Sequence, residues 1–329
     1  MSAFDNGLHH QDSPGFVEFP AYDVDIVSAE LPCGVAWLVN CLIELDVPIS
    51  KPWNAHVPDE WERLDDHCYR YARADEPWKR TLPGLVRDRI FRFRPGPVPR
   101  VSHAWPRFHP ASRKTILFVR DPRDALYSAW QRARQGRTIG LEVGFAEWVR
   151  APFHHYPLSV AEYLLLFLRV WREAIRDREA LVLRYEDYRR AAVPTLRRAL
   201  AFLRIDSEEA ALLRTAERSD FAVLRDMESR QLARGDIQFA HNRAGRAFEY
   251  VDTFDAPMHA ALGPRFADIY AWLGYERDRS GLVAQERRTG HDVGSILRAM
   301  RADQLPTPAR EWLQAAVAQC THDFAFAFA

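Results

Sequence analysis

An arginine stands directly after a short apolar run, at a point where α/β proteins commonly bind ligands. The run over residues 115–119, TILFV, is rich in β-branched and aromatic residues and predicts a strand buried on both faces. Arg120 follows, and Asp121 and Pro122 then begin a helical pattern as N-cap and first helical residue. A helix N-terminus offers free N–H groups to an anion, and Ser128, two helical turns further on, faces the same side. Arg120 and Ser128 therefore predict a phosphate site, because arginine suits bidentate contact with phosphate.

A second turn of this kind comes earlier in the chain. Residues 22–28 predict a first strand, and residues 34–45, GVAWLVNCLIEL, predict an apolar helix that Gly34 opens. The backbone N–H groups at this helix start can hold a second anionic group. Cys33, beside the glycine, is open to two interpretations: a reactive thiolate at a helix start, or a small residue that fits the turn.

Strands and helices alternate along the rest of the chain. Further strands are predicted over residues 101–103 and 180–184, and further helices over residues 122–135, 145–149, 160–178, 191–203, 206–234 and 256–273. This alternation predicts an α/β fold with a central parallel sheet flanked by helices on both faces.

Four stretches fall outside this alternation. We expect residues 1–20 to form an irregular arm, residues 51–99 a long surface excursion, and residues 235–255 a loop. Residues 281–329 are expected to be a helical extension for packing or oligomerisation, after a domain that ends near residue 280.

The composition excludes several classes of function. Of the 329 residues, 47% are hydrophobic and 27% charged, which is typical of an ordinary globular protein. The formal net charge is zero, so neither nucleic acid nor a membrane is an expected partner. Four cysteines without metal-ligand spacing and a start without a signal peptide indicate a cytoplasmic protein with no metal. The many arginines and alanines indicate a bacterial source. A kinase-like P-loop phosphotransferase is disfavoured, because no glycine-rich loop ends in Lys-Ser or Lys-Thr.

Four motifs resemble those of the cytosolic-type sulfotransferases, in the order and spacing of that family. They are residues 31–38 (LPCGVAWL), residues 119–124 (VRDPRD) with Ser128, residues 183–187 (LRYED), and Arg243-Ala244-Gly245 with Tyr250 and Phe254. The resemblance implies a P-loop-like sulfotransferase fold that binds 3′-phosphoadenosine 5′-phosphosulfate (PAPS) and releases adenosine 3′,5′-bisphosphate (PAP). It implies transfer of the sulfuryl group to a hydroxyl or amine of a small-molecule acceptor, in a role such as bacterial secondary metabolism.

The resemblance also implies which residues contact the nucleotide. The implied phosphate ligands are Arg120, Ser128, Arg243, the backbone of Gly245, and the turn residues Cys33, Gly34, Val35 and Ala36. The implied adenine contacts are Trp37, Tyr185, Ser219 and Phe221. Glu186 and Asp187, which follow Tyr185, are interpreted as structural.

His103 is the candidate catalytic base. The segment over residues 101–106, VSHAWP, resembles the family segment that carries a histidine before the 3′-phosphate motif. A histidine with a pKa near neutrality can take the proton of the acceptor as the acceptor attacks sulfur. We expect the acceptor to be bound by residues 51–99 and 136–159. The aromatic residues of these stretches that predict a pocket are Trp53, Trp61, Trp78, Phe153, His154 and Tyr156.

Two departures from the family leave an alternative open. Pro32 stands where the family has the loop lysine, and Val101 where it has a second lysine. These positions supply positive charge where negative charge grows in the transition state. The chain is therefore either a transferase that uses another cation, with Arg100 the nearest in sequence, or a non-catalytic relative that binds PAP or PAPS. A homodimer is left open.

Overall fold

The computed structural model describes residues 23–49, 61–65, 68–71, 90–106, 109, 112–153, 156, 158–234 and 245–275 of the chain. The predicted arm, the predicted extension and Arg243 lie outside these residues. Trp53, Trp78 and His154 of the expected acceptor pocket also lie outside them, and nothing is described of the Trp61 side chain. The predictions made for these residues stay predictions.

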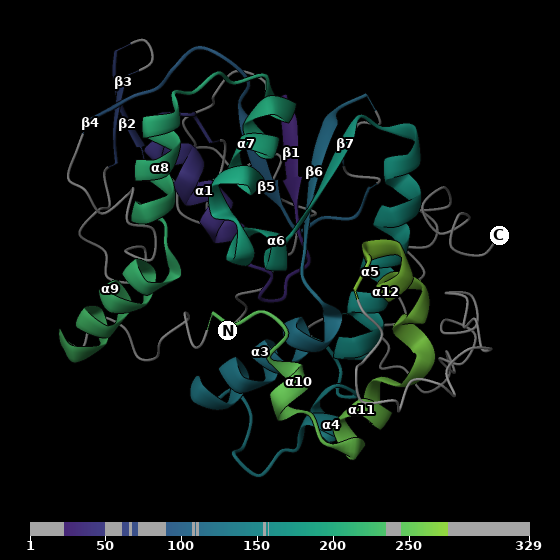
Figure 1. Cartoon of the computed structure of the whole chain (residues 1–329). Helices are drawn as coiled ribbons and strands as arrows, with labels where there is room; N and C mark the ends of the chain where they lie inside the picture. The colour runs from purple at the N-terminus through teal and green to yellow at the C-terminus, as the bar shows by residue number, and fades with distance from the viewer. Residues whose placement is uncertain are drawn as a thin grey trace.

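A four-stranded parallel sheet forms the centre of the fold (Figure 1). Its strands, in spatial order, are β5 (Pro99–Ser102), β1 (Val24–Val27), β6 (Lys114–Val119) and β7 (Ala180–Arg184). Because the strands run in the same direction, their carboxyl ends meet at one edge of the sheet, where ligands bind in open α/β folds. Ser28, His103, Arg120 and Tyr185 each follow one of these strands. The parallel sheet predicted from the alternation of strands and helices is confirmed.

The helices that follow the first strands begin where the sequence predicts. α1 (Val35–Glu44) follows the turn after β1, and α3 (Pro122–Gln135) follows β6 with Asp121 as its N-cap. α5 (Val160–Ala174) begins with a capping box. The other described helices are α4 (Phe145–Trp148), a 3-10 helix (Ile175–Asp177), α6 (Tyr185–Arg190), α7 (Ala192–Leu203), α8 (Glu209–Arg218), α9 (Phe221–Arg234), α10 (Tyr250–Thr253), α11 (Ala256–Leu262), a 3-10 helix (Gly263–Phe266) and α12 (Ala267–Leu273).

The two central strands of the sheet, β1 and β6, are buried, and the apolar run of β6 packs on both faces as it predicts. Ile116 and Phe118 of β6 pack in one core, which includes residues of α1, α7 and α8. Leu117 and Val119, which alternate with them, pack in a second core with residues of α3, α5 and α12. In Figure 1, α1, α7 and α8 lie to one side of the strands, and α5 and α12 lie to the other. The fold is therefore an α/β fold with helices on both faces of the sheet.

The stretch expected to be a surface excursion contains a second, antiparallel sheet. Its strands are β2 (Trp61–Asp65), β3 (Cys68–Tyr71) and β4 (Ile90–Arg92), paired in that order. Phe91 is fully buried and joins the core around α1. The prediction of a surface stretch is therefore wrong for Cys68 and Phe91, which are buried, whereas Leu64 and Ile90 are exposed. The tryptophans, prolines and charges of the stretch hide the short strands from sequence analysis.

The helical prediction also departs from the structure in several places. The helix predicted over residues 206–234 is two helices, α8 and α9, and the loop predicted over residues 235–255 contains α10. α6 begins directly after β7, with no loop between them, and the sequence analysis placed no helix there. The predicted helix over residues 256–273 is divided by Gly263 and Pro264 into α11, a 3-10 helix and α12. Gly263, directly after α11, has a φ of 54°. A residue with a positive φ does not continue a right-handed helix, and glycine adopts such an angle readily, so α11 ends here.

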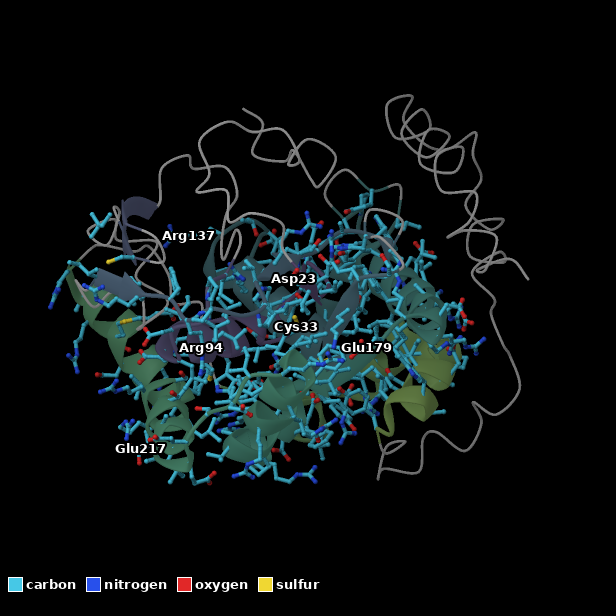
Figure 2. The ribbon with its side chains drawn as sticks, turned by 90° about the horizontal axis from the view of Figure 1, so that it is seen from above. Asp23, Cys33, Arg94, Arg137, Glu179 and Glu217 are labelled. Atoms are coloured by element: carbon cyan, nitrogen blue, oxygen red, sulfur yellow. The ribbon has the colours of Figure 1, made fainter. Side chains whose placement is uncertain are left out.

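The described cysteines Cys33, Cys41 and Cys68 are buried free thiols. Cys33, labelled in Figure 2, lies inside the body of the protein. None of the helices in the described ranges combines the length and the apolar character needed to cross a bilayer.

Candidate functional site

The candidate base is held by hydrogen bonds at the ends of two neighbouring strands. Ser28 follows β1 and His103 follows β5, and the Ser28 N–H donates to the Ser102 carbonyl at 3.1 Å. Nδ1 of His103 lies 2.9 Å from the Ser28 carbonyl oxygen. A carbonyl can only accept, so Nδ1 carries the proton and Nε2 keeps its lone pair.

The surroundings of His103 favour its neutral form. Desolvation lowers the pKa of His103 below its ordinary value, although the hydrogen bond to the Ser28 carbonyl acts in the opposite direction and the residue keeps contact with solvent. No hydrogen bond joins Nε2 to any residue in the described ranges. A neutral imidazole with a free Nε2 lone pair is the form that a general base requires.

A second polar cluster holds the strand that carries His103. Nε2 of His109 lies 3.1 Å from Ser102 Oγ, and its Nδ1 lies 2.9 Å from Oδ2 of the fully buried Asp25. Arg100 Nε lies 3.5 Å from Oδ1 of the same carboxylate. Arg100, the nearest cation in sequence to His103, is therefore committed to Asp25 on β1. This ion pair opposes the prediction that Arg100 supplies the missing charge at the turn.

Glu30 is a carboxylate that sequence reasoning missed, two residues beyond Ser28. Its backbone N–H donates to the Tyr163 hydroxyl at 3.1 Å, and the Tyr156 hydroxyl donates to its Oε1 at 3.0 Å. Burial raises the pKa of Glu30 to about 7, although the bond from Tyr156 acts in the opposite direction. Phe153, which with Tyr156 is among the residues expected to line the acceptor pocket, stacks on Tyr156 at 5.9 Å between ring centroids.

Gly34 adopts a backbone conformation that the turn requires. Its φ of 87° and ψ of 12° are left-handed, and it is the N-cap of α1. A Cβ at this position would lie 2.5 Å from Cδ2 of Tyr185, so the third motif packs directly on the first. Burial raises the pKa of Cys33, which favours a small packing residue over a reactive thiolate.

Arg120 joins three of the predicted motifs. Its Nη1 donates to the Pro32 carbonyl at 3.2 Å, and its Nη2 donates to the Arg246 carbonyl at 3.1 Å. The guanidinium lies 4.3 Å from the ring centroid of Tyr185, and Nη2 lies 3.7 Å from Oδ2 of Asp124. The structure thus brings the glycine turn, the strand end before α3 and the late loop to one arginine.

The late loop also meets α9. Gly245 has a φ of 62°, and a Cβ on it would lie 2.4 Å from Cδ1 of Phe221. The guanidinium of Arg189, which sequence reasoning did not single out, lies 5.2 Å from the Phe221 ring centroid and 5.8 Å from that of Tyr188. Two of the implied nucleotide residues, Phe221 and Gly245, are therefore in contact.

Two of the implied adenine contacts are covered by the protein itself. Trp37 is 2% exposed, and one face of its ring stacks on Tyr188 at 4.3 Å between centroids and 10° between planes. Ser219 is fully buried, and its hydroxyl accepts from Asn40 Nδ2 at 2.7 Å. The face of Trp37 that Tyr188 covers is not open to adenine, and the roles of Trp37 and Ser219 stay predictions.

The remaining implied phosphate ligands lie on the two helix starts. Val35 and Ala36 open α1, and Ser128 is half-buried on α3. Their contacts with phosphate stay predictions.

Glu186 has the structural role that the sequence analysis gave it. It accepts from the Asp121 N–H at 3.0 Å and from the Tyr275 hydroxyl at 2.8 Å. It thereby ties the end of β7 to the N-cap of α3. Burial raises the pKa of Glu186 to about 7. Asp187 pairs with Arg184 through both carboxylate oxygens and is likewise structural.

Comparison with known proteins adds one family and several solved structures. The model of a family described as "Sulfotransferase domain" matches residues 93–267, more than half of the chain. No curated protein sequence matches the chain.

The similar solved structures have low sequence identity. Retinol dehydratase in complex with androsterone and inactive cofactor PAP has a TM-score of 0.48 and 18% identity, over 78% of this chain and 81% of that one. Retinol dehydratase with retinol and PAP has a TM-score of 0.46 and 18% identity, with the same coverage. The mouse sulfotransferase SULT7A1 complexed with PAP has a TM-score of 0.47 and 16% identity, over 78% of this chain and 86% of that one.

Proposed function

Because the chain belongs to the family of PAPS-dependent sulfotransferases, we propose that it transfers a sulfuryl group from PAPS to a hydroxyl or amine of a small-molecule acceptor. The observation that carries this proposal is the position of His103. Its Nδ1–H is bonded to the Ser28 carbonyl, which leaves Nε2 ready to accept a proton. The site lies at the carboxyl edge of the parallel sheet, where this class of fold binds its ligands.

His103 acts as general base in the proposed reaction. Nε2 takes the proton of the acceptor as the acceptor oxygen or nitrogen forms its bond to sulfur. The bond between sulfur and the bridging phosphate oxygen breaks, and its electron pair leaves with PAP. The hydrogen bond from Nδ1 to Ser28 then stabilises the imidazolium that results.

The two helix starts and Arg120 suit the two anionic groups of the nucleotide. The N–H groups at the start of α1 face the turn at Gly34, and Arg120 reaches both this turn and the late loop. Arg120 donates to the carbonyl of Pro32, so a positive charge lies at the turn although the lysine of the family is absent. We propose that Arg120, with Ser128 and Arg243, binds the 3′-phosphate and also offsets part of the charge lost at Pro32.

A second function follows from the same residues. Pro32, Val35 and Ala36 lack the ammonium and hydroxyl groups of the family turn, which favours a relative that binds PAP or PAPS without catalysis. Both functions place the nucleotide site within residues 1–280. They differ in whether an acceptor is sulfated.

The test is transfer of radiolabelled sulfate from PAPS in a broad acceptor screen, with calorimetry of PAP binding beside it. His103→Ala should lower turnover about a hundredfold or more while PAP affinity stays close to that of the wild type. His259→Ala, a histidine on α11, is the matched control and should keep full turnover. Equal turnover in His103→Ala and wild type would remove the base. PAP binding without transfer to any acceptor would support the non-catalytic function.

A further inference from the structure

Glu30 and His103 lie on two neighbouring chain segments, which follow adjacent strands of the sheet. The segment after β1 carries Ser28 and Glu30, and the segment after β5 carries His103 and Trp105. Ser28 bonds His103 through its carbonyl, and two residues of chain span at most about 7 Å. The backbone of Glu30 is therefore close enough to His103 for one small acceptor to contact both side chains.

A ring of contacts closes this arrangement. Tyr156 donates to Glu30, and the Trp105 ring meets Tyr156 edge-on at 6.2 Å between centroids. Trp105 meets Tyr163 in the same way at 5.9 Å, and the Tyr163 hydroxyl accepts from the Glu30 N–H. Glu30 is thus fixed on its backbone and on one carboxylate oxygen, beside the segment that carries His103.

The second carboxylate oxygen is differently placed. Within the described ranges, Oε2 of Glu30 has no hydrogen-bond partner, and the residue is only half-buried. No arginine or lysine of these ranges forms an ion pair with Glu30. A glutamine could accept the same hydrogen bond from the Tyr156 hydroxyl without placing a charge among aromatic rings. A carboxylate at this position therefore suits a hydrogen-bond donor that comes from a bound ligand.

We propose that Glu30 binds a protonated amine of the acceptor, and that the acceptor class is a phenol or alcohol with an amino group on a short arm. This rests on the proposed function, in which His103 accepts the proton of the acceptor hydroxyl. An ammonium group beside Glu30 favours the ionised carboxylate, because an opposite charge offsets the desolvation that burial imposes. The same carboxylate disfavours acceptors that carry a carboxylate of their own.

Calorimetry with three matched phenols tests the proposal without requiring turnover. The probes are tyramine, 4-ethylphenol and 4-hydroxyphenylpropionate, which share a phenol ring and differ in the charge of the arm. Each is titrated into the full chain with and without PAP. We expect tyramine to bind about tenfold or more tighter than 4-ethylphenol, the scale of one charge-assisted hydrogen bond, and the anionic probe to bind weakest.

Variants locate the effect. Glu30→Gln should abolish the preference for tyramine and leave the affinity for 4-ethylphenol unchanged, whereas Glu147→Gln, at an exposed glutamate of α4, should keep the preference. Tyr156→Phe removes the bond that orients the carboxylate and should reduce the preference without removing the charge. If Glu30→Gln does not fold, Tyr156→Phe is the variant that tests the proposal.

The outcomes are distinct for the two proposals. Equal affinity for tyramine and 4-ethylphenol, binding of neither, or a preference that survives in Glu30→Gln overturns the assignment of Glu30. A protein that prefers tyramine through Glu30 but binds no PAP supports that assignment and contradicts the proposed sulfotransferase function instead.

Discussion

Gly34 is the residue whose substitution tests the glycine turn most sharply. Its left-handed backbone costs an L-residue about 1–2 kcal/mol. An added Cβ would also lie 2.5 and 2.9 Å from Cδ2 and Cε2 of Tyr185, so the tyrosine ring must shift. Such overpacking costs about 1–3 kcal/mol, because a well-packed interior does not yield freely. We expect Gly34→Ala to lower the free energy of unfolding by about 2–5 kcal/mol.

Gly274 provides a control with the same backbone strain and no clash. Its φ of 70° and ψ of 22° are also left-handed, but the nearest atom to an added Cβ is Arg184 Nη1 at 3.6 Å, an ordinary contact. Gly274→Ala should therefore cost only about 1–2 kcal/mol. Urea unfolding of both variants measures the difference. Equal losses of stability would show that Tyr185 does not pack on Gly34, and the argument for the turn would then be wrong.

Two further predictions concern charged groups. The pKa of Glu186 is raised in the folded state from 4.5 to about 7, so the folded state holds its proton over this range and stability falls as pH rises through it. The loss in the free energy of unfolding approaches about 3 kcal/mol. Between pH 5 and pH 8 this free energy should fall less for Glu186→Gln than for the wild type. Identical falls in the two proteins would contradict the raised pKa. Arg120→Ala should weaken PAP binding by about 2 kcal/mol in calorimetry and affect adenosine 5′-monophosphate less, whereas Arg197→Ala, at an exposed pair, should change neither. Equal affinity of the wild type for the two nucleotides would contradict this role.

The central fold could be predicted because the strands at the middle of the sheet, β1 and β6, are mostly apolar and read locally. Residues 115–119 and 180–184 need no distant partner to be recognised. The helix after the first run, α3, carries an ordinary N-cap, whereas α6 after the second has no side-chain cap and is not predicted. The second sheet could not be predicted in this way. Phe91 shows its burial only through contacts with the core around α1, and the charges that flank it hide the strand.

The residues of the candidate site also differ in whether local sequence reveals them. His103 and Arg120 could be found because each follows a strand, and the end of a parallel strand is a place in the fold that sequence reveals. Glu30 could not, because the Tyr156 that fixes its carboxylate lies 126 residues away. The covering of Trp37 by Tyr188 was hidden for the same reason: Trp37 lies on α1 and Tyr188 on α6, and only the fold stacks them.

In the proposed function, Arg120 links the turn that lacks the family lysine to the nucleotide. Its N–H groups are bonded to the carbonyls of Pro32 and Arg246, which are neutral acceptors, while the Asp124 carboxylate lies farther off, at 3.7 Å from Nη2. A hydrogen bond to a phosphate oxygen is about twice as strong as one to a neutral acceptor, so a phosphate competes well for the same donors. The exchange releases both carbonyls at once, one on the glycine turn and one on the late loop. If Arg120 binds the 3′-phosphate as proposed, recognition of that phosphate and the conformation of the turn are coupled through a single guanidinium. Arg120→Lys, which keeps the charge but not the two-sided fork, should lose this coupling.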